Sequence, residues 1–229
     1  MIYQNDEFEN TQNIFFLAVK NLKLPKLLRN SNISKSCGIL ASNVFIFLLL
    51  LAFQGKNLFR FLNSKDKDKA NSKNTYYRFL SNNSYNWIKF LSLLSCKVIS
   101  NFSHLTKPDR VKAFVIDDSV FKRNRSKNVE LLAKVFDNAG HSFVKGFTML
   151  TLGWTDGYSF VPVGLNLLSS SKKSNRYQEA NDTLDKRTNG YKIRKQSTLS
   201  KPESVLELLK NAKLRYNCRL CLDGHMVYQ

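Results

Sequence analysis

A chain of 229 residues that is 43% hydrophobic and 12% aromatic can bury a core, which excludes a wholly disordered protein. Its 36 lysines and arginines against 17 acidic residues give a formal net charge of +19, which favours nucleic acid or an anionic membrane surface as partner. Its sparse cysteines, Cys37, Cys96, Cys218 and Cys221, fit a reducing cytoplasm and give no disulfide framework. Polar and acidic residues follow Met1, so we expect no secretory signal.

The N-terminal part of the chain has the apolar spacing of helices. Its most apolar run, Ile39–Phe53, is shorter than the ~20 residues that cross a bilayer and contains Ser42 and Asn43, so we predict a buried helix. Further on, a short helix, a polar turn at 81–84 and an amphipathic helix from Trp87 have the outline of a helix-turn-helix. A plain helical hairpin is an equally good interpretation.

The pattern changes to that of strands after residues 103–110, which we interpret as a linker. We predict strands at 113–118, 129–136, 143–154 and 159–168, with turns at 137–140 and 155–158. A strongly basic loop follows. Ser200 and Glu203 then form a capping box that predicts a helix over 202–213.

The first predicted strand ends in two carboxylates, Asp117 and Asp118, followed by Ser119. Such a strand end can hold a divalent cation, because Mg²⁺ prefers carboxylate and phosphate oxygens. A capped strand end with solvated acids is the simpler alternative. An isolated Asp-Asp pair does not decide between the two.

Longer strings carry a resemblance to a known family. The segments IDDSVFKRNRSKNVELLAKVFD, FVKGFTMLTLGWTDGYSFVPVGLNLLSSS and DKRTNGYKIRK resemble bacterial insertion-sequence DDE transposases of the type-four group, over at least residues 112–210. The segments GKNLFRFLNS and TYYRFLSNNSYNW are similar to that group's N-terminal region. The resemblance implies an α+β or α/β protein: a helical DNA-binding region at 1–105, then an incomplete ribonuclease-H-like core with a mixed β-sheet at 111–229.

The resemblance also implies a metal site. In this family an Asp, Asp and Glu triad binds two divalent ions, Mg²⁺ or Mn²⁺, which activate the attacking oxygen and stabilise the leaving one. The first Asp of the triad matches the pair Asp117–Asp118. We prefer Asp118 as metal ligand and catalytic residue, because it directly precedes Ser119 and Asp117 points to the other face of an alternating strand. Asp117 remains the alternative.

Cationic side chains beside such a site are candidates for DNA phosphate contacts. Three follow the acids: Lys122, Arg123 and Arg125. An ordinary solvated hairpin is the alternative for these three. The others occupy the basic loop and the residues after it: Lys172, Lys173, Arg176, Lys186, Arg187, Lys192, Arg194 and Lys195.

The chain departs from the family after the helix at 202–213. The second acid is expected there in an apolar strand that ends in Asp-Ser/Thr-Trp-Phe, but the sequence reads CLDGHMVYQ, in which Asp223 is the only substitute. The codons of Met226 and Val227, shifted by one base, contain TGG, the codon for Trp. The shifted frame permits the expected motif, so we expect a frameshift near Leu214–Asn217, with the tail from about 215 out of frame. Cys218 and Cys221 would then have no role in zinc binding.

The leading hypothesis is an insertion-sequence transposase that acts on double-stranded DNA at transposon ends, here as a truncated and inactive fragment. It would work in the bacterial cytoplasm, associated with the nucleoid, with a homodimer possible and no membrane partner. The first alternative is a non-catalytic DNA-binding protein or an inhibitor of transposition. The second is a basic membrane-associated protein built on residues 39–53.

Overall fold

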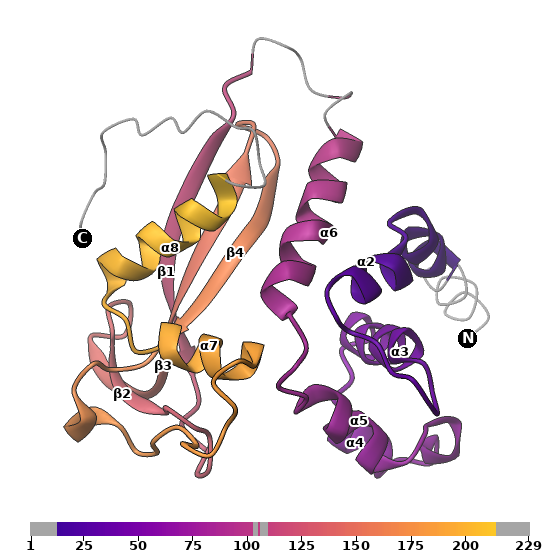
Figure 1. Ribbon diagram of the computed structural model, residues 1–229, viewed down its shortest axis with the longest axis horizontal. Coiled ribbons are helices and arrows are strands. Elements are labelled where there is room, and N and C mark those ends of the chain that lie inside the picture. The colour runs from indigo at the N-terminus through magenta and orange to yellow at the C-terminus, as the bar shows by residue number, and fades with distance from the viewer. Residues whose placement is uncertain (1–12, 103–104, 106–109, 214–229) are drawn as a thin grey trace. The chain divides into compact units, whose positions relative to one another are not determined.

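The computed structural model describes residues 13–102, 105 and 110–213 (Figure 1). The chain divides into two compact units between Phe90 and Leu91, inside helix α6 (Trp87–Phe102). The predicted division into 1–105 and 111–229 remains a prediction. Each unit is described by itself below.

The N-terminal unit is helical. Residues 13–21 form a helix, and the elements that follow are α2 (Leu24–Asn30), α3 (Ala41–Phe53), α4 (Leu58–Leu62), the 3₁₀ helix η1 (Lys67–Lys69) and α5 (Lys73–Leu80). Pro25 occupies the first turn of α2, where its missing N–H costs nothing. The Asn57 side chain caps α4 by accepting a 2.8 Å hydrogen bond from the N–H of Phe59.

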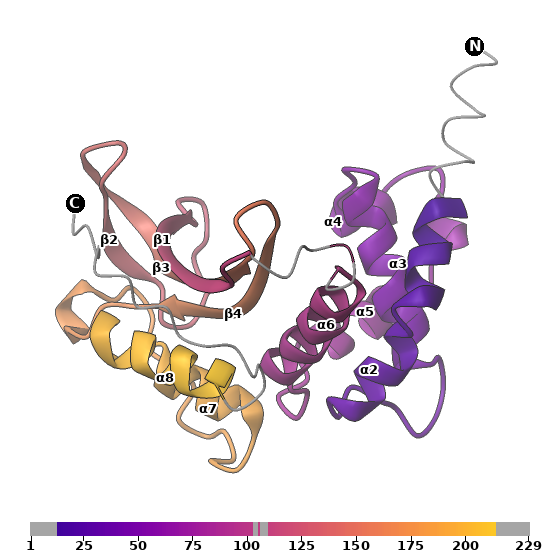
Figure 2. The ribbon, with the colours of Figure 1, turned by 90° about the horizontal axis from the view of Figure 1, so that it is seen from above.

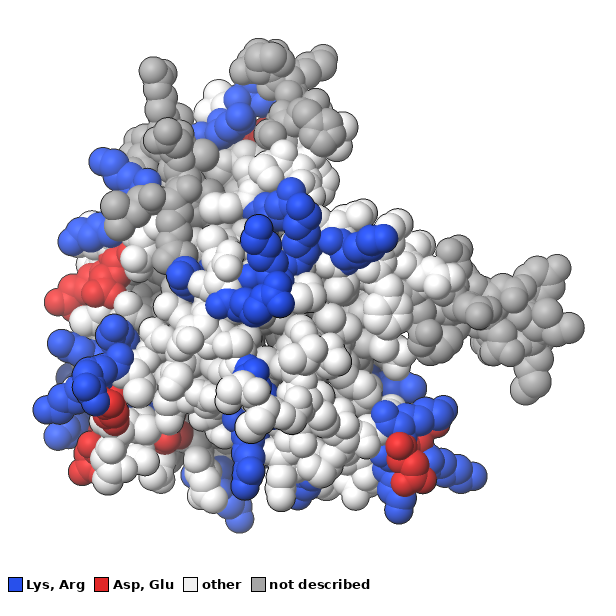
Figure 3. Space-filling model, turned by 45° about the vertical axis from the view of Figure 1, so that its right-hand side comes forward, with Lys and Arg blue, Asp and Glu red and all other residues white. Residues whose placement is uncertain are grey.

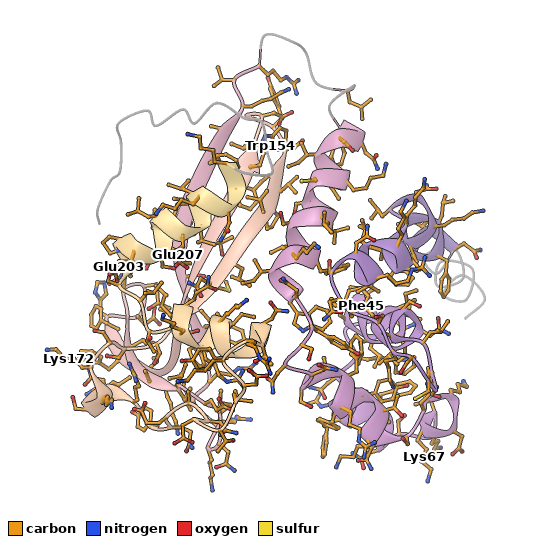
Figure 4. All side chains as sticks on the ribbon, in the orientation of Figure 1. Phe45, Lys67, Trp154, Lys172, Glu203 and Glu207 are labelled. Atoms are coloured by element: carbon orange, nitrogen blue, oxygen red, sulfur yellow. The ribbon has the colours of Figure 1, made fainter. Side chains whose placement is uncertain are left out.

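Helix α3 is the apolar run that the sequence predicted as a buried helix. Phe45, labelled in Figure 4, packs against Trp87 and Phe90, with ring centroids 6.0 and 5.1 Å away. Phe47 packs against Tyr76 at 5.1 Å. Aromatic packing of this kind adds to the burial of apolar area. Among the described residues, no helix combines the length and apolar character that a membrane span requires.

The two helices around the turn at 81–84 are α5 and α6. Trp87 packs edge-on against Phe79 at 5.6 Å and against Tyr85 at 6.1 Å. These rings belong to the core of the N-terminal unit and do not form an exposed stacking platform. The helix–turn–helix outline is present, and a role in DNA binding remains a prediction.

The second unit contains a four-stranded sheet. Its strands are β1 (Ala113–Lys122), β2 (Ala133–Asp137), β3 (Ser142–Thr155) and β4 (Phe160–Leu168). The long strand β3 pairs with each of the other three, and every pairing is antiparallel. The mixed α/β architecture is confirmed and is compatible with a ribonuclease-H-like core, although the described strands include no parallel pair.

Strand β1 is longer than predicted. The sequence interpretation ended it at Asp118, but pairing with β3 continues to Lys122, which lies opposite Gly146. Val120 and Phe121 favour extended backbone, and the partner strand is long enough to receive them. The two acids therefore lie inside a strand rather than at its end, and the predicted strand end is wrong.

Helices cover one face of the sheet. The helices α7 (Asn189–Gln196) and α8 (Lys201–Lys213) follow the 3₁₀ helix η2 (Lys173–Asn175), and Figure 2 shows α7 and α8 on the same side of the sheet. The predicted capping box is confirmed, because the N–H and hydroxyl of Ser200 donate to Glu203 Oε2 at 3.0 and 2.7 Å.

The main core of this unit lies between the sheet and α8. Its central residues are Leu150, Leu152, Trp154, Val161, Val163, Leu168, Leu208 and Ala212. A Cβ atom added to Gly164 would come within 3.0 Å of Leu208 Cδ2, so the absence of a side chain there lets α8 approach β4 closely. Cys96, Val98 and Ile99 of α6 pack against the same core.

The opposite face of the sheet is only partly covered in the described part of the chain, and one edge is open there. A second core cluster lies on this face, where the sheet residues Phe121, Phe147 and Leu167 pack with Leu131, Leu132 and Ala180. Val115, Phe160 and Leu165 have 43%, 55% and 39% of their surface exposed. Strand β1 pairs only with β3 among the described strands, so its outer edge has no strand partner there.

Candidate metal centre and DNA-contacting surface

Asp118 lies on the helix-covered face of β1. Side chains alternate along a strand, and the even-numbered Phe114 and Ile116 pack against the core under α8. Asp118 lies directly opposite the buried Leu150, which belongs to the same core. The strand therefore places this carboxylate at the rim of the core, where its side chain is 40% exposed.

Lys201 is the partner of Asp118. Its Nζ donates to Asp118 Oδ2 at 2.7 Å, across 83 residues of sequence. Lys201 is the first residue of α8, and the Ser200–Glu203 capping box fixes the start of that helix. The carboxylate of Asp118 therefore has a cationic partner from α8, with which a metal ion would compete.

A buried polar pair lies next to this ion pair. Asn166 of β4 is opposite Leu150, so Asp118, Leu150 and Asn166 form one row across three strands. The Asn166 amide donates to Ser204 Oγ of α8 at 2.7 Å, and both residues are buried. Ser204 lies one turn after Lys201, so the same helix face meets the whole row. This pair fixes the position of α8 above the acid.

Asp117 faces the other way. It lies opposite Thr151 and is exposed on the face away from α8. The two carboxylates therefore diverge and do not share a cation. Of the two, Asp118 is the one that the structure pairs with a cation, Lys201 of α8.

The residues present fit part of a metal site. The described residues contain no group of three or more His, Cys, Asp or Glu side chains that could hold a metal ion. Mg²⁺ often takes only one or two carboxylates and completes its shell with water and substrate phosphates. Asp118 can supply one such ligand. Asp223, the substitute for the second acid, lies outside the described residues.

Most of the predicted phosphate-contacting side chains are exposed. The exposed ones are Lys122, Arg123, Arg125, Lys172, Lys173, Lys186, Arg187, Lys192 and Lys195. Figure 3 shows one face of the molecule, where blue basic side chains gather in several groups and far fewer acidic ones are visible. Figure 4 shows Lys172 projecting outward from its loop. The loop is stabilised within itself, since Arg187 pairs with Asp185 at 3.0 Å.

Two of the predicted cations are used inside the protein. The Arg176 side chain is only 8% exposed, and it donates to the carbonyl of Ser170 and to Glu179. Arg194 binds both carboxylate oxygens of Glu130, at 2.5 and 3.1 Å. The hydrogen bond from Arg194 holds the pKa of Glu130 below its usual value.

Lys122 is exposed but paired. Its Nζ lies 2.5 Å from Asp137 Oδ2. This hydrogen bond, with backbone N–H groups of Gly140 and Ala139, lowers the pKa of Asp137. Asp137 thus closes the β2–β3 turn, as a turn acid is expected to do, and holds Lys122 in place.

The sequence analysis missed Lys201, Asn166 and Ser204. A signal was available for two of them. Asn166 is the only polar side chain in the apolar strand VGLNLL, and Ser204 shares the spacing of the buried Leu208 and Ala212 on one face of α8. Nothing local in the sequence indicated that Lys201 would meet Asp118.

An acid at the rim of a mixed α/β core, in a strongly basic chain, indicates a protein that works on nucleic acid. The family comparison gives the class: the chain belongs to the DDE superfamily endonuclease family, whose model matches residues 41–222. Proteins of this family act on DNA and normally use divalent metal ions. Searches of curated proteins and of solved structures found no match.

Proposed function

We propose that this protein is an insertion-sequence transposase of the type-four group by descent, with Asp118 as the first acid of its triad. The observation that carries the proposal is the position of Asp118. It lies on the helix-covered face of the first strand, at the sheet edge that has no strand partner among the described residues. The family match and the net charge of +19 support DNA as the substrate. Transposon ends, a homodimer and the bacterial nucleoid belong to the same proposal.

The chemistry assigned to the site is phosphoryl transfer on DNA. Two divalent ions, when bound, activate the attacking oxygen and stabilise the leaving one. Asp118 would hold one of them, in competition with the ammonium of Lys201 that now binds its carboxylate. The exposed lysines of the basic loop would contact the DNA backbone without reading its sequence.

We also propose that this chain alone does not cleave DNA. Its described residues contain no group of three or more His, Cys, Asp or Glu side chains that could hold a metal ion, whereas a two-metal centre needs several ligands. The chain should still bind DNA, because phosphate contacts need no acid. A DNA-binding protein or an inhibitor without catalysis is the second candidate, and the pairing of Asp118 with Lys201 favours it.

The test uses the full chain and labelled duplexes. One duplex carries the inverted repeats that flank the coding sequence, and a matched duplex carries a shuffled sequence. A transposase should prefer the inverted repeats, and Asp118→Asn should keep that preference but lose Mn²⁺ binding. Equal binding of both duplexes would overturn the assignment to transposon ends. Metal-dependent nicking by the chain alone would overturn the proposed inactivity.

A further inference from the structure

The β2–β3 hairpin carries an unusual surface on the sheet face away from α8. Four side chains form it: Lys134 and Phe136 from β2, and Phe143 and Lys145 from β3. We call these four residues the hairpin surface. Phe143 and Lys145 occupy odd positions of β3, as does Thr151 opposite Asp117, so the hairpin surface lies on the opposite face from Asp118.

One cross-strand pair of the hairpin surface weakens the fold, and the other leaves two aromatic rings exposed. Lys134 lies directly opposite Lys145, and like charges in this position destabilise a strand pair. Phe136 and Phe143, also opposite each other, are 46% and 62% exposed. An opposite charge in the first pair would be more stable. The Phe136–Phe143 pair is favourable across the two strands, but it leaves both rings in contact with water. A bound partner that is both anionic and aromatic would offset the repulsion of the lysines and cover the rings.

The cations and rings are interleaved. Lys134 Nζ lies 4.5 Å from the ring centre of Phe143, and the Phe136 and Phe143 rings meet edge to face at 5.2 Å. Beside them, Lys145 Nζ lies 4.6 Å from the ring centre of Tyr177. Contacts of this kind hold the ammonium groups close to the rings.

More positive charge lies at the rim of the hairpin surface. Arg123, at the end of β1, lies over Phe121 at 4.4 Å and donates its backbone N–H to the carbonyl of Lys145 at 2.7 Å. The nearest acid in sequence, Asp137, is buried and bound to Lys122. It therefore does not neutralise the exposed cations. The surface is positive and aromatic at once.

The positive charge and the exposed rings together indicate which kind of nucleic acid this surface fits. A duplex presents phosphates to a protein surface, but its base faces are stacked inside the helix. An unpaired strand presents phosphates and base faces together, and proteins bind such strands with a cationic surface and exposed aromatic rings. Side chains two residues apart on a strand are separated by about 6.6 Å, so lysines and rings alternate on a scale suited to successive nucleotides.

We propose that the hairpin surface binds unpaired nucleotides, with Phe136 and Phe143 against base faces and Lys134 and Lys145 against the phosphates. The surface requires neither Asp118 nor a metal ion. It therefore goes beyond the proposed function and can fail independently of it. A protein that works at a DNA end would use such a surface to hold bases that have left the duplex.

The test compares an oligothymidine single strand with a blunt duplex, bound to the full chain and measured by fluorescence anisotropy. The double variant F136A/F143A should weaken single-strand binding at least about tenfold and leave duplex binding nearly unchanged. The matched control is Tyr158→Ala. Tyr158 is 82% exposed and lies under Arg110 at 4.0 Å, but it follows the other end of β3. This control should bind both ligands normally.

The lysines are tested through salt dependence. K134Q/K145Q should lower the slope of log Kd against log salt by about 1.4 for the single strand, since each phosphate contact contributes about 0.7. The control K210Q/K213Q changes two exposed lysines at the end of α8 and should leave the slope unchanged. Urea unfolding should show that K134Q/K145Q is at least as stable as the parent chain, because like charges are removed.

Two results would overturn the proposal. The first is an equal loss of single-strand and duplex binding in F136A/F143A, or no loss in either. The second is a change in sedimentation without a change in oligonucleotide binding, which would assign the surface to contacts between copies of the chain. If the parent chain binds the single strand but does not prefer the inverted-repeat duplex over the shuffled one, the result counts against the proposed function and not against the hairpin surface.

Discussion

Replacing Lys201 tests whether Asp118 is a cation-binding carboxylate. The ammonium of Lys201 lies 2.7 Å from Asp118 Oδ2. A metal ion must displace it and then remain near a positive charge. Lys201→Met keeps the length of the side chain and removes that charge. We therefore expect the variant to bind Mn²⁺ more tightly than the parent chain.

The magnitude follows from the exposure of the pair. The side chains of Lys201 and Asp118 are 54% and 40% exposed, so the dielectric around them is close to that of water. Two unit charges 4 Å apart in water interact by about 1 kcal/mol, which doubles to about 2 kcal/mol for a divalent ion. This corresponds to about thirtyfold in affinity and is an upper value, because the ammonium can turn into solvent. We expect an increase of about threefold to thirtyfold.

Mn²⁺ titration followed by electron paramagnetic resonance measures this affinity without DNA. Lys201→Arg serves as the control, since it keeps the charge, and it should bind no more tightly than the parent chain. Unfolding free energies of Lys201→Met and the parent chain should agree within about 1 kcal/mol, as expected for an exposed ion pair. Equal or weaker Mn²⁺ binding by Lys201→Met would refute the reasoning. So would loss of binding in Asp117→Asn but not in Asp118→Asn.

Two further predictions concern stability. Asn166→Leu or Ser204→Ala alone should cost about 1–3 kcal/mol of unfolding free energy, because each leaves a buried polar partner unpaired. The double variant should cost less than the sum, and additive costs in a double-mutant cycle would refute a direct bond. Arg194 lowers the pKa of Glu130 below its ordinary 4.5. The pair therefore contributes fully to the unfolding free energy above pH 4.5, and this contribution is lost as the pH falls through the lowered pKa of Glu130 in the folded protein. Glu130→Gln should therefore lose less stability than the parent chain between about pH 6 and pH 3 in urea titrations, and equal losses would contradict this.

Local patterns predicted most elements of the fold. The capping box at Ser200 and Glu203 located the start of α8, and the apolar run at 39–53 corresponds to α3. The end of β1 was misplaced, because Asp117 and Asp118 resemble a strand terminus in sequence. What keeps them extended is pairing with β3, a contact between segments about 30 residues apart along the chain.

The surroundings of the candidate site could be predicted only in part. The alternation of side chains along a strand was enough to predict that Asp117 and Asp118 point to opposite faces of the sheet. The pairing of Asp118 with Lys201 depends on where α8 crosses the sheet, which no local pattern encodes. The same limit applies to Arg176 and Arg194. Both belong to a basic segment whose composition is typical of a phosphate-binding surface, yet their guanidinium groups bind partners within the protein.

The outer edge of β1 has a consequence for how the protein behaves at high concentration. An exposed strand edge presents a row of backbone N–H and C=O groups that a strand of another molecule can join. Among the described strands this edge of β1 has no partner, so such self-association would run along the strand that carries Asp118 and would bring a second chain beside its carboxylate. The affinity of Asp118 for a metal ion should then fall as the protein concentration rises. Metal binding at the site would therefore depend on how far the chain self-associates.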